Sequence, residues 1–182
     1  LHLAQKAQAI NPKDSASTLA VISLEVRLSR WHEALHHLQN SKLPRSEKKR
    51  IQALIQLARG ELLLAEGHDE QSLALARNVI SVLPNFAPAI VFVARAYSEN
   101  DRQRKAMALL TKAWKNSPSP LIADALREIT LHELPERKEK LLSALIGNTV
   151  NGTWQCKTCN HNQKIWDLHC DSCHDFDSLE WK

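Results

Sequence analysis

The four cysteines of this 182-residue chain all stand between positions 156 and 173. They form two pairs, Cys156 with Cys159 and Cys170 with Cys173. Two residues separate the cysteines of each pair, and ten residues separate the pairs. A gap of two residues allows one tight turn to present both sulfurs to a single ion, and two such turns complete a tetrahedral site. The spacing therefore predicts that these four cysteines bind one metal ion.

Zinc is the expected metal, because it commonly fills closed sites of four thiolates. Iron is chemically compatible with the same ligands. A pair of redox-active dithiols is the alternative to a metal site, and it is disfavoured because no βαβ pattern surrounds the cysteines. Since four thiolates already close the site, we expect His161, His169 and His174 to lie beside the metal site or on the surface. The left-handed backbone wanted after the second cysteine of each pair suits Asn160 better than His174.

The cysteines lie in a segment, residues 153–182, that we call the ribbon. Apolar and polar residues alternate at three places in it, which predicts short strands at residues 153–155, 165–168 and 178–181. About 30 residues bury too little surface to fold alone, so we expect metal binding to supply the folding free energy. Three tryptophans of the ribbon are expected to cover the metal site and to dock the ribbon on the rest of the chain: Trp154, Trp166 and Trp181.

The residues before the ribbon repeat with a period of 34. This step relates five pairs of positions: Gly60 to Ala94, Leu63 to Tyr97, Ser72 to Ala106, Val79 to Ala113 and Pro84 to Pro118. Small residues recur where helices approach closely, and proline recurs just past a helix end. An earlier copy fits if four residues are inserted, and we place them in a lengthened turn at residues 41–50; Ala34 then matches Ser72.

These features resemble the tetratricopeptide repeat, a helix–turn–helix unit of 34 residues whose copies stack into a solenoid. The resemblance implies an α-α superhelix; with the cysteine segment, we expect a mainly α fold in which this superhelix is followed by a small rubredoxin-like zinc ribbon. We assign residues 1–120 to the repeats, the first one truncated, and 121–146 to capping helices. Residues 147–152, which hold two of the four glycines, form the expected linker to the ribbon at 153–182.

Such solenoids bind proteins or peptides on the side that the first helix of each pair lines. The resemblance and the helical spacing give seven candidate groove residues: Leu54, Leu57, Glu61, Leu64, Val91, Arg95 and Ser98. The apolar members of this set could instead be packed core, and the sequence alone does not separate the two.

Composition and charge narrow the function classes. The longest apolar runs are far too short to span a bilayer, and residues 1–10 lack the pattern of a secretory signal. From Gly147 onward there are 3 basic and 5 acidic residues, which leaves 21 basic and 15 acidic residues before it. An acidic ribbon whose aromatic residues are not interleaved with Lys or Arg argues against nucleic-acid binding. No nucleophile set, phosphate loop or zinc-protease motif indicates an enzyme.

The ribbon also resembles the C-terminus of the HemY family of alphaproteobacteria, through Trp154-Gln-Cys-Lys-Thr-Cys, Trp166, Cys170-Asp-Ser-Cys173 and Phe176-Asp-Ser-Leu-Glu-Trp181. That family is membrane-anchored and associated with haem biosynthesis. Asp171 and His174 depart from the Pro and Gly often found in such turns. As a second possibility, the chain resembles LapB-like proteins, which are membrane-anchored regulators of lipopolysaccharide synthesis and have the same cysteine spacing.

We therefore expect a non-enzymatic adaptor for a protein or peptide partner. Because the chain opens at Leu1 within a helical pattern, we interpret it as the soluble part of a longer protein, anchored at the cytoplasmic face of a bacterial inner membrane. Electron transfer through an iron–tetrathiolate ribbon is the alternative from another class.

Overall fold

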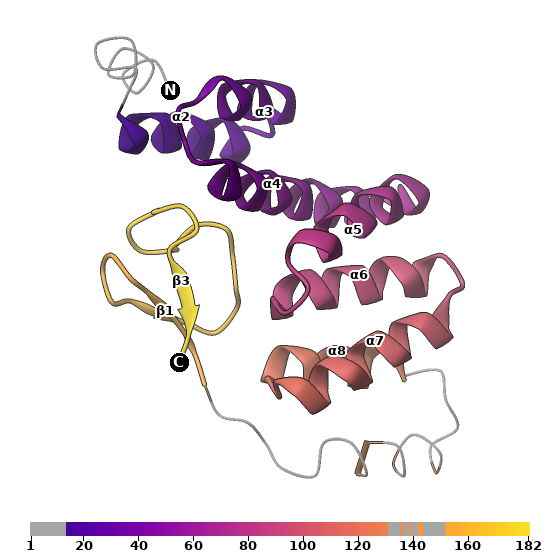
Figure 1. The fold of residues 1–182 in the computed structure, drawn as a ribbon. Helices are drawn as coiled ribbons and strands as arrows, with labels where there is room; N and C mark the ends of the chain where they lie inside the picture. Colours follow the sequence, from indigo (N-terminus) through magenta and orange to yellow (C-terminus); the bar gives the residue numbers. More distant parts are fainter. Residues whose placement is uncertain (1–13, 131–135, 137–138, 140–141, 144–151) are drawn as a thin grey trace.

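The computed structural model describes residues 14–130, 136, 139, 142–143 and 152–182. This part of the chain is mainly helical and ends in a small antiparallel sheet, which confirms the predicted fold class at this coarse level (Figure 1). Its helices are α2 (Ser15–Arg27), α3 (Trp31–Asn40), α4 (Arg45–Ala65), α5 (Asp69–Val82), α6 (Ala87–Glu99), α7 (Gln103–Asn116) and α8 (Pro120–Ile129).

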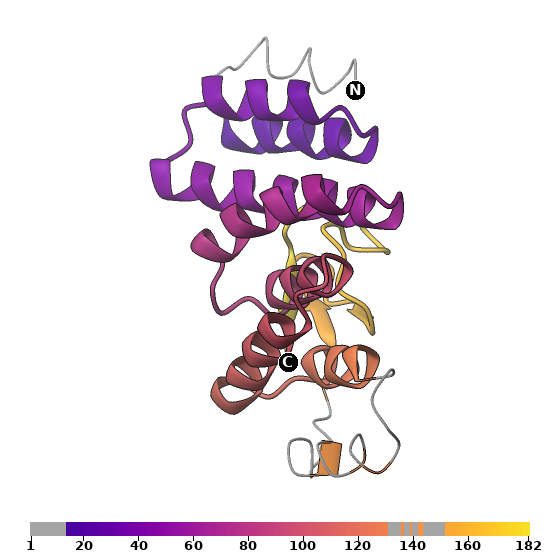
Figure 2. The same cartoon turned by 90° about the vertical axis from the view of Figure 1, so that its right-hand side faces the viewer.

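Successive helices pack as the pairs α2 with α3, α4 with α5 and α6 with α7, and Figure 2 shows the pairs stacked in layers. The turn inside each pair holds one residue with positive φ: Ser29, Gly67 and Asp101. Gly67 and Asp101 are 34 positions apart, whereas Ser29 precedes Gly67 by 38. In all three turns the following N–H donates a 2.8 Å bond to the carbonyl five residues back. The three turns are therefore equivalent and follow the period found in the sequence.

Small residues allow these helices to approach closely. A Cβ on Gly60 would lie 2.3 Å from Cζ of Phe92, so glycine is required where α4 meets α6. At the equivalent place in each second helix, Ala34, Ser72 and Ala106 are fully buried. The Ser72 hydroxyl donates a 3.1 Å hydrogen bond to the Gly60 carbonyl. The residues that recur in the sequence thus occupy recurring contact points.

The predicted lengthened turn at residues 41–50 is wrong, because α4 already begins at Arg45. Helix α4 has 21 residues against 13 in α6, and the extra residues lengthen its first turns. Pro44 precedes the helix, Glu47 suits the positive end of the helix dipole, and Lys and Arg are good helix formers. The Nζ atom of Lys48 also donates to the carbonyls of Gln39 and Ser41, which fixes the extension to the end of α3.

The ribbon forms a three-stranded antiparallel sheet in the order β2-β1-β3. Its strands are β1 (Trp154–Cys156), β2 (Asn162–Gln163) and β3 (Leu179–Trp181). The first and last lie where strands were predicted, but the strand predicted at 165–168 is absent and β2 precedes it. In that stretch Ile165 is 75% exposed, whereas Leu168 is buried in the core of the helices.

The ribbon packs against one side of the helices (Figures 1 and 2). Residues 1–13, where the predicted repeats begin with a truncated copy, lie outside the described residues. Most of the predicted cap beyond α8 and residues 147–151 of the predicted linker also lie outside them. Among the described helices, none is both long and apolar enough to cross a membrane.

Candidate metal centre and the adjoining cleft

The four cysteine sulfurs come together at one end of the ribbon. All four Sγ atoms lie within 4.8 Å of one another. Cys156 Sγ is 3.6 Å from Cys173 Sγ, and Cys159 Sγ is 3.6 Å from Cys170 Sγ. A tetrahedral zinc site with bonds of about 2.3 Å places its sulfurs about 3.8 Å apart. The sulfurs are thus spaced to hold a metal ion, as the sequence predicted, while the geometry leaves zinc and iron equally compatible.

The two cysteine turns have the same backbone geometry. In the first turn the N–H of Asn160 donates to the Cys156 carbonyl, and in the second that of His174 donates to the Cys170 carbonyl, both at 2.9 Å. Asn160 has φ 58° and His174 has φ 59°. His174 therefore takes the left-handed conformation despite its side chain, at a cost that a closed turn must offset. The departure from glycine at this position does not alter the turn.

Hydrogen bonds prepare one sulfur to lose its proton. Burial alone would raise the pKa of Cys156, but its hydrogen bond with the Ser178 hydroxyl and those from the backbone N–H groups of Cys159 and Thr158 lower it to about 6. The N–H of Asp175 favours the Cys173 thiolate, yet burial and the neighbouring sulfurs raise the pKa of Cys173 to about 12. The charge on one sulfur thus opposes the ionisation of its neighbours. A divalent cation relieves that repulsion, which is the condition for a tetrathiolate site.

Side chains also tie the two turns together. The Thr158 hydroxyl bonds the carboxylate of Asp175, and His161 Nε2 lies 2.9 Å from Asp171 Oδ1. His161 therefore pairs across the turns on the surface, in agreement with the prediction. Asp171, which replaces the proline often found in such turns, provides the second half of this link.

The third histidine, His169, connects the ribbon to the helices instead of the metal site. Its Nε2 atom lies 3.0 Å from the Ser23 hydroxyl on α2, and its ring packs against Phe176. Burial at this contact lowers the pKa of His169. The contact of His169 with α2 depends on how the ribbon docks, so the cysteine spacing could not predict it.

Aromatic and charged contacts complete the docking. Phe86, at the start of α6, makes edge contacts with Trp154 and Trp166 at centroid distances of 6.3 and 5.2 Å. Arg50 donates two 2.9 Å hydrogen bonds to the Asp177 carboxylate. The expected docking role of the ribbon tryptophans is confirmed for these two, whereas Trp181 packs on Trp154 inside the ribbon. The partners on the helices carry no sequence signal, because single aromatic or basic residues there match no motif.

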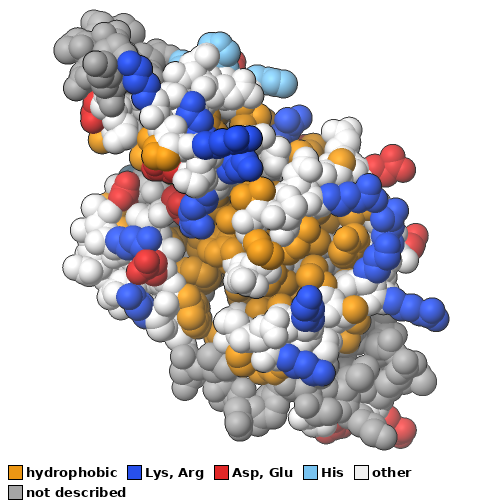
Figure 3. Space-filling model, in the orientation of Figure 1, with side chains coloured by type: hydrophobic (Ala, Val, Ile, Leu, Met, Phe, Trp, Pro, Cys, Tyr) orange, Lys and Arg blue, Asp and Glu red, His pale blue; other side chains and the backbone are white. Residues whose placement is uncertain are grey.

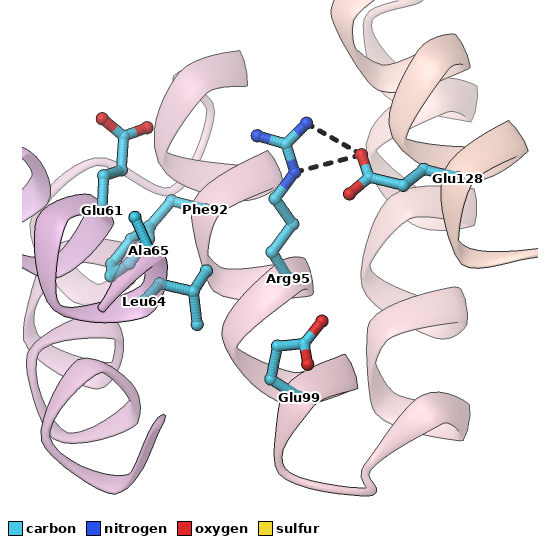
Figure 4. A pocket seen from close by; sticks show the side chains of 7 residues that line it. All are labelled: Glu61, Leu64, Ala65, Phe92, Arg95, Glu99 and Glu128. Atoms are coloured by element: carbon cyan, nitrogen blue, oxygen red, sulfur yellow. Dashed lines mark hydrogen bonds and ion pairs between the residues drawn. The ribbon is translucent and has the colours of Figure 1, made fainter. Parts of the chain in front are cut away.

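Among the hollows near this contact, two share one residue, Glu61. One is bounded by α2, α4 and the ribbon loop around residues 166–169. The other, which we call the cleft, lies between α4, α6 and α8, has a volume of about 280 Å³, and is lined by Glu61, Leu64, Ala65, Phe92, Arg95, Glu99 and Glu128 (Figure 4). Figure 3 shows hydrophobic side chains gathered in the depression between the ribbon and the helices. We call this side of the molecule the inner face.

The seven predicted groove residues separate into two groups. Glu61, Leu64 and Arg95 line the cleft. The other four do not: Leu54 and Leu57 are fully buried, Val91 is 3% exposed, and Ser98 is half-buried with its hydroxyl bonded to Gln103. The prediction that Leu54, Leu57 and Val91 face a groove is therefore corrected, since they pack in the core, the alternative that the sequence had left open. Phe92, Glu99 and Glu128 line the cleft without having been predicted.

The electrostatics of the cleft centre on Glu61 and Arg95. Glu61 is open to solvent, but protein atoms surround it on several sides, and the resulting loss of hydration raises its pKa to about 7. Arg95 opposes this shift, and the negative charge of Asp167 adds to it. Arg95 itself donates from Nε and Nη2 to Glu128 at 3.1 and 2.8 Å (Figure 4). Glu61 thus lies between the cleft and the ribbon without a direct partner among the described residues.

Comparisons with known proteins add no family assignment. The chain matches no family model and no curated protein. The geometry of the cysteine site and of the inner face is therefore the basis for a functional proposal.

Proposed function

We propose that this chain is a non-enzymatic adaptor that holds a protein or peptide partner in the cleft of its inner face. The proposal rests on one observation: the ribbon covers one part of that face and leaves the other part open. The ribbon covers the part formed by α2 and the first half of α4, through the Arg50–Asp177 and Ser23–His169 contacts. The part between α4, α6 and α8 is left as a hollow with apolar and charged lining.

The repeated helix pairs support the tetratricopeptide assignment that the period of 34 suggests. Repeats of this kind bind their partners along one extended face, because each pair contributes one helix to it. Partner binding on the side of α4, α6 and α8 would follow that pattern.

We propose a structural role for the metal. A site closed by four thiolates leaves no coordination position for a substrate, so the ion would stabilise the ribbon instead of performing catalysis. Cys156, Cys159, Cys170 and Cys173 would hold it, with zinc as the expected ion. Stoichiometric zinc in the purified protein would support this proposal.

Electron transfer is the second candidate, because two of the four ligand residues, Cys159 and Cys173, are exposed. An iron–tetrathiolate site near the surface could exchange electrons with a partner. Strong visible absorption that bleaches on reduction would favour this function, whereas a colourless protein containing zinc would exclude it.

The adaptor proposal is tested by photocrosslinking in cells that express the full-length protein. Leu64, inside the cleft, is replaced by p-benzoylphenylalanine, and the matched control carries the same group at Ala108, an exposed position on α7 outside the cleft. We expect a discrete crosslinked protein from position 64 and none of the same mass from position 108. Equal products from both positions, or none from position 64, would contradict the proposal.

The resemblance of the ribbon supports a cellular setting for this adaptor. We propose that it belongs to a HemY-like protein anchored at the cytoplasmic face of the inner membrane and associated with haem biosynthesis, with a LapB-like role in lipopolysaccharide assembly as the alternative. Affinity capture of the full-length protein from membranes separates the two. Haem-pathway enzymes among the captured proteins would support the first, and lipopolysaccharide-pathway enzymes the second.

A further inference from the structure

The lining of the cleft combines an apolar floor with negative charge at its edges. Phe92 is 1% exposed and lies against Gly60, so its ring closes the bottom of the cleft between α4 and α6. Leu64 and Ala65 form the wall on the side of α4. Three carboxylates stand around this floor: Glu61, Glu99 and Glu128 (Figure 4).

Arg95, the cation among the residues that line the cleft, is already matched. Both hydrogen bonds of its guanidinium go to one carboxylate oxygen of Glu128. No cation among the described residues forms an ion pair with Glu61 or Glu99. When Glu61 is ionised, three carboxylates and one guanidinium leave the cleft with a negative balance. A local excess of negative charge therefore exists in a chain whose formal net charge is +4.

The position of Glu61 makes that excess unfavourable for the free protein. Its carboxylate is partly stripped of water and faces the added charge of Asp167 on the ribbon loop. A cation placed between α4 and α6 would restore the favourable interaction that hydration no longer supplies. Phosphate groups would be repelled by the same residues, which argues against a nucleic acid or a phospholipid headgroup as the occupant.

We propose, building on the adaptor function, that the cleft binds a lysine or arginine side chain of the partner segment. The alkyl stem would lie over Phe92 and Leu64, and the cationic group would reach Glu61, while Glu99 adds negative charge at the opposite end of the cleft (Figure 4). Long basic side chains suit such a site, because they bury an apolar stem while the charged end stays near the surface. The partner is thus a segment that carries at least one accessible basic residue, and Arg95 and Glu128 set the outer limit of the site.

A defined probe tests this inference. Fluorescein-labelled hexa-arginine is titrated with the full chain, loaded with metal, and binding is followed by anisotropy at low salt. Hexaglutamate serves as the charge-reversed probe. The test variant is Glu61→Gln with Glu99→Gln, and the matched control is Glu66→Gln with Glu70→Gln, two exposed carboxylates at the turn from α4 to α5. Circular dichroism verifies that every variant is folded.

We expect hexa-arginine to bind despite the basic net charge, and hexaglutamate to bind more weakly. Neutralising two partly exposed carboxylates together should weaken hexa-arginine binding roughly 5- to 10-fold in the test variant. The control variant should change the affinity much less than the test variant does. Equal weakening in both variants, or no binding of hexa-arginine to the wild-type chain, would overturn the inference.

A second readout uses the unmodified protein. The carboxyl carbon of Glu61 is followed by NMR as pH changes, with and without hexa-arginine. A bound cation should lower the pKa of Glu61 from its value of about 7. An unchanged titration at saturating probe would contradict the inference even if the probe bound elsewhere. A discrete crosslink from position 64 together with this negative result would leave the adaptor function intact and remove only the cationic specificity.

Discussion

The helical region and the ribbon of this chain bury their apolar residues on different scales. The helices share two extended core clusters, in which residues such as Ile22, Leu57 and Leu110 are fully buried. The core of the ribbon consists of Trp154, Cys156, Cys170 and Leu179, so that two of its four residues are predicted metal ligands. The helices can therefore be stabilised by burial, whereas we expect the ribbon to need a metal ion for its stability.

Interactions between the two regions modify this difference. Leu168 of the ribbon lies in the larger helical cluster, and Phe86 at the start of α6 packs on the ribbon tryptophans. We therefore expect the metal to fold the ribbon and the helices to position it. It follows that the metal should control how much of the inner face is covered. Substitutions in one region should leave the other region folded. The loss of stability that each substitution causes in the other region measures how strongly the two are coupled.

The largest effect should come from removing two metal ligands, Cys156→Ser with Cys159→Ser. A structural zinc ion contributes apparent free energies of about 10 to 16 kcal/mol in small zinc domains. We expect the ribbon to unfold, with a red shift of the fluorescence of Trp154 and Trp166, while the far-ultraviolet helical signal is mostly kept. Thr158→Ser, which keeps the hydroxyl beside Asp175, is the control and should leave both signals unchanged. Loss of the whole helical signal would show that the regions fold as one unit.

A matched pair of glycine substitutions should affect one region each. A Cβ at Gly60 would lie 2.3 Å from the Phe92 ring, and one at Gly152 would lie 2.2 Å from the Trp181 ring. Crowding of this kind costs about 1 to 3 kcal/mol. Gly60→Ala should lower the melting temperature of the helices without changing metal affinity. Gly152→Ala should instead weaken the ribbon and its metal binding. Calorimetry and a metal titration separate the two, and a reversal of these effects would contradict the account.

The ion pair between the regions should contribute less. Arg50 and Asp177 are partly exposed, so Asp177→Asn should weaken docking by roughly 0.5 to 1 kcal/mol at low salt and by less at high salt. Asparagine tolerates the positive φ of 49° at this position, which keeps the turn intact. Urea unfolding monitored by tryptophan fluorescence at two salt concentrations measures the effect. Glu180→Gln is the control. It breaks ion pairs within the ribbon and leaves the Arg50 contact intact, so it should not weaken docking.

The effect of pH should be the smallest, because Glu61 is exposed and solvent screens its charge. The pKa of Glu61 is about 7 in the folded chain and near 4.5 when unfolded, so the folded state holds a proton that the unfolded state has released between these values. The stabilisation from this group is fully present below pH 4.5 and is lost as pH rises through 7. The stability difference between wild type and Glu61→Gln should therefore fall over this window. A difference that is constant or rises would contradict this assignment; Glu66→Gln is the control.

The cysteine cluster and the period of 34 could be predicted from sequence, because both depend on local spacing. Two cysteines separated by two residues fit one turn wherever that turn lies, and Ala34, Ser72 and Ala106 mark the same contact in each pair. The start of α4 was missed for a local reason. Charged residues at 45–50 look like a turn when only polarity is read, although Glu, Lys and Arg are also good helix formers.

Which of the predicted groove residues are buried and which are exposed could not be predicted. Helical spacing indicates which residues share a face, but Leu57 and Glu61 share one and differ completely in exposure. That difference depends on where α6 and the ribbon lie. The docking of the ribbon through Ser23, Arg50 and Phe86 joins residues far apart in the chain, and no pattern within the sequence marks such pairs.

Hydrogen exchange measured with and without metal tests most directly the claim that the metal folds the ribbon and burial folds the helices. The full chain is compared before and after treatment with a chelator. Separate peptides report on the ribbon and on helices α4 to α7. The account predicts that amides of β1 and β3 lose protection after chelation while those of α4, α5 and α6 keep theirs. Joint loss of protection in both regions, or a ribbon that stays protected without metal, would contradict it.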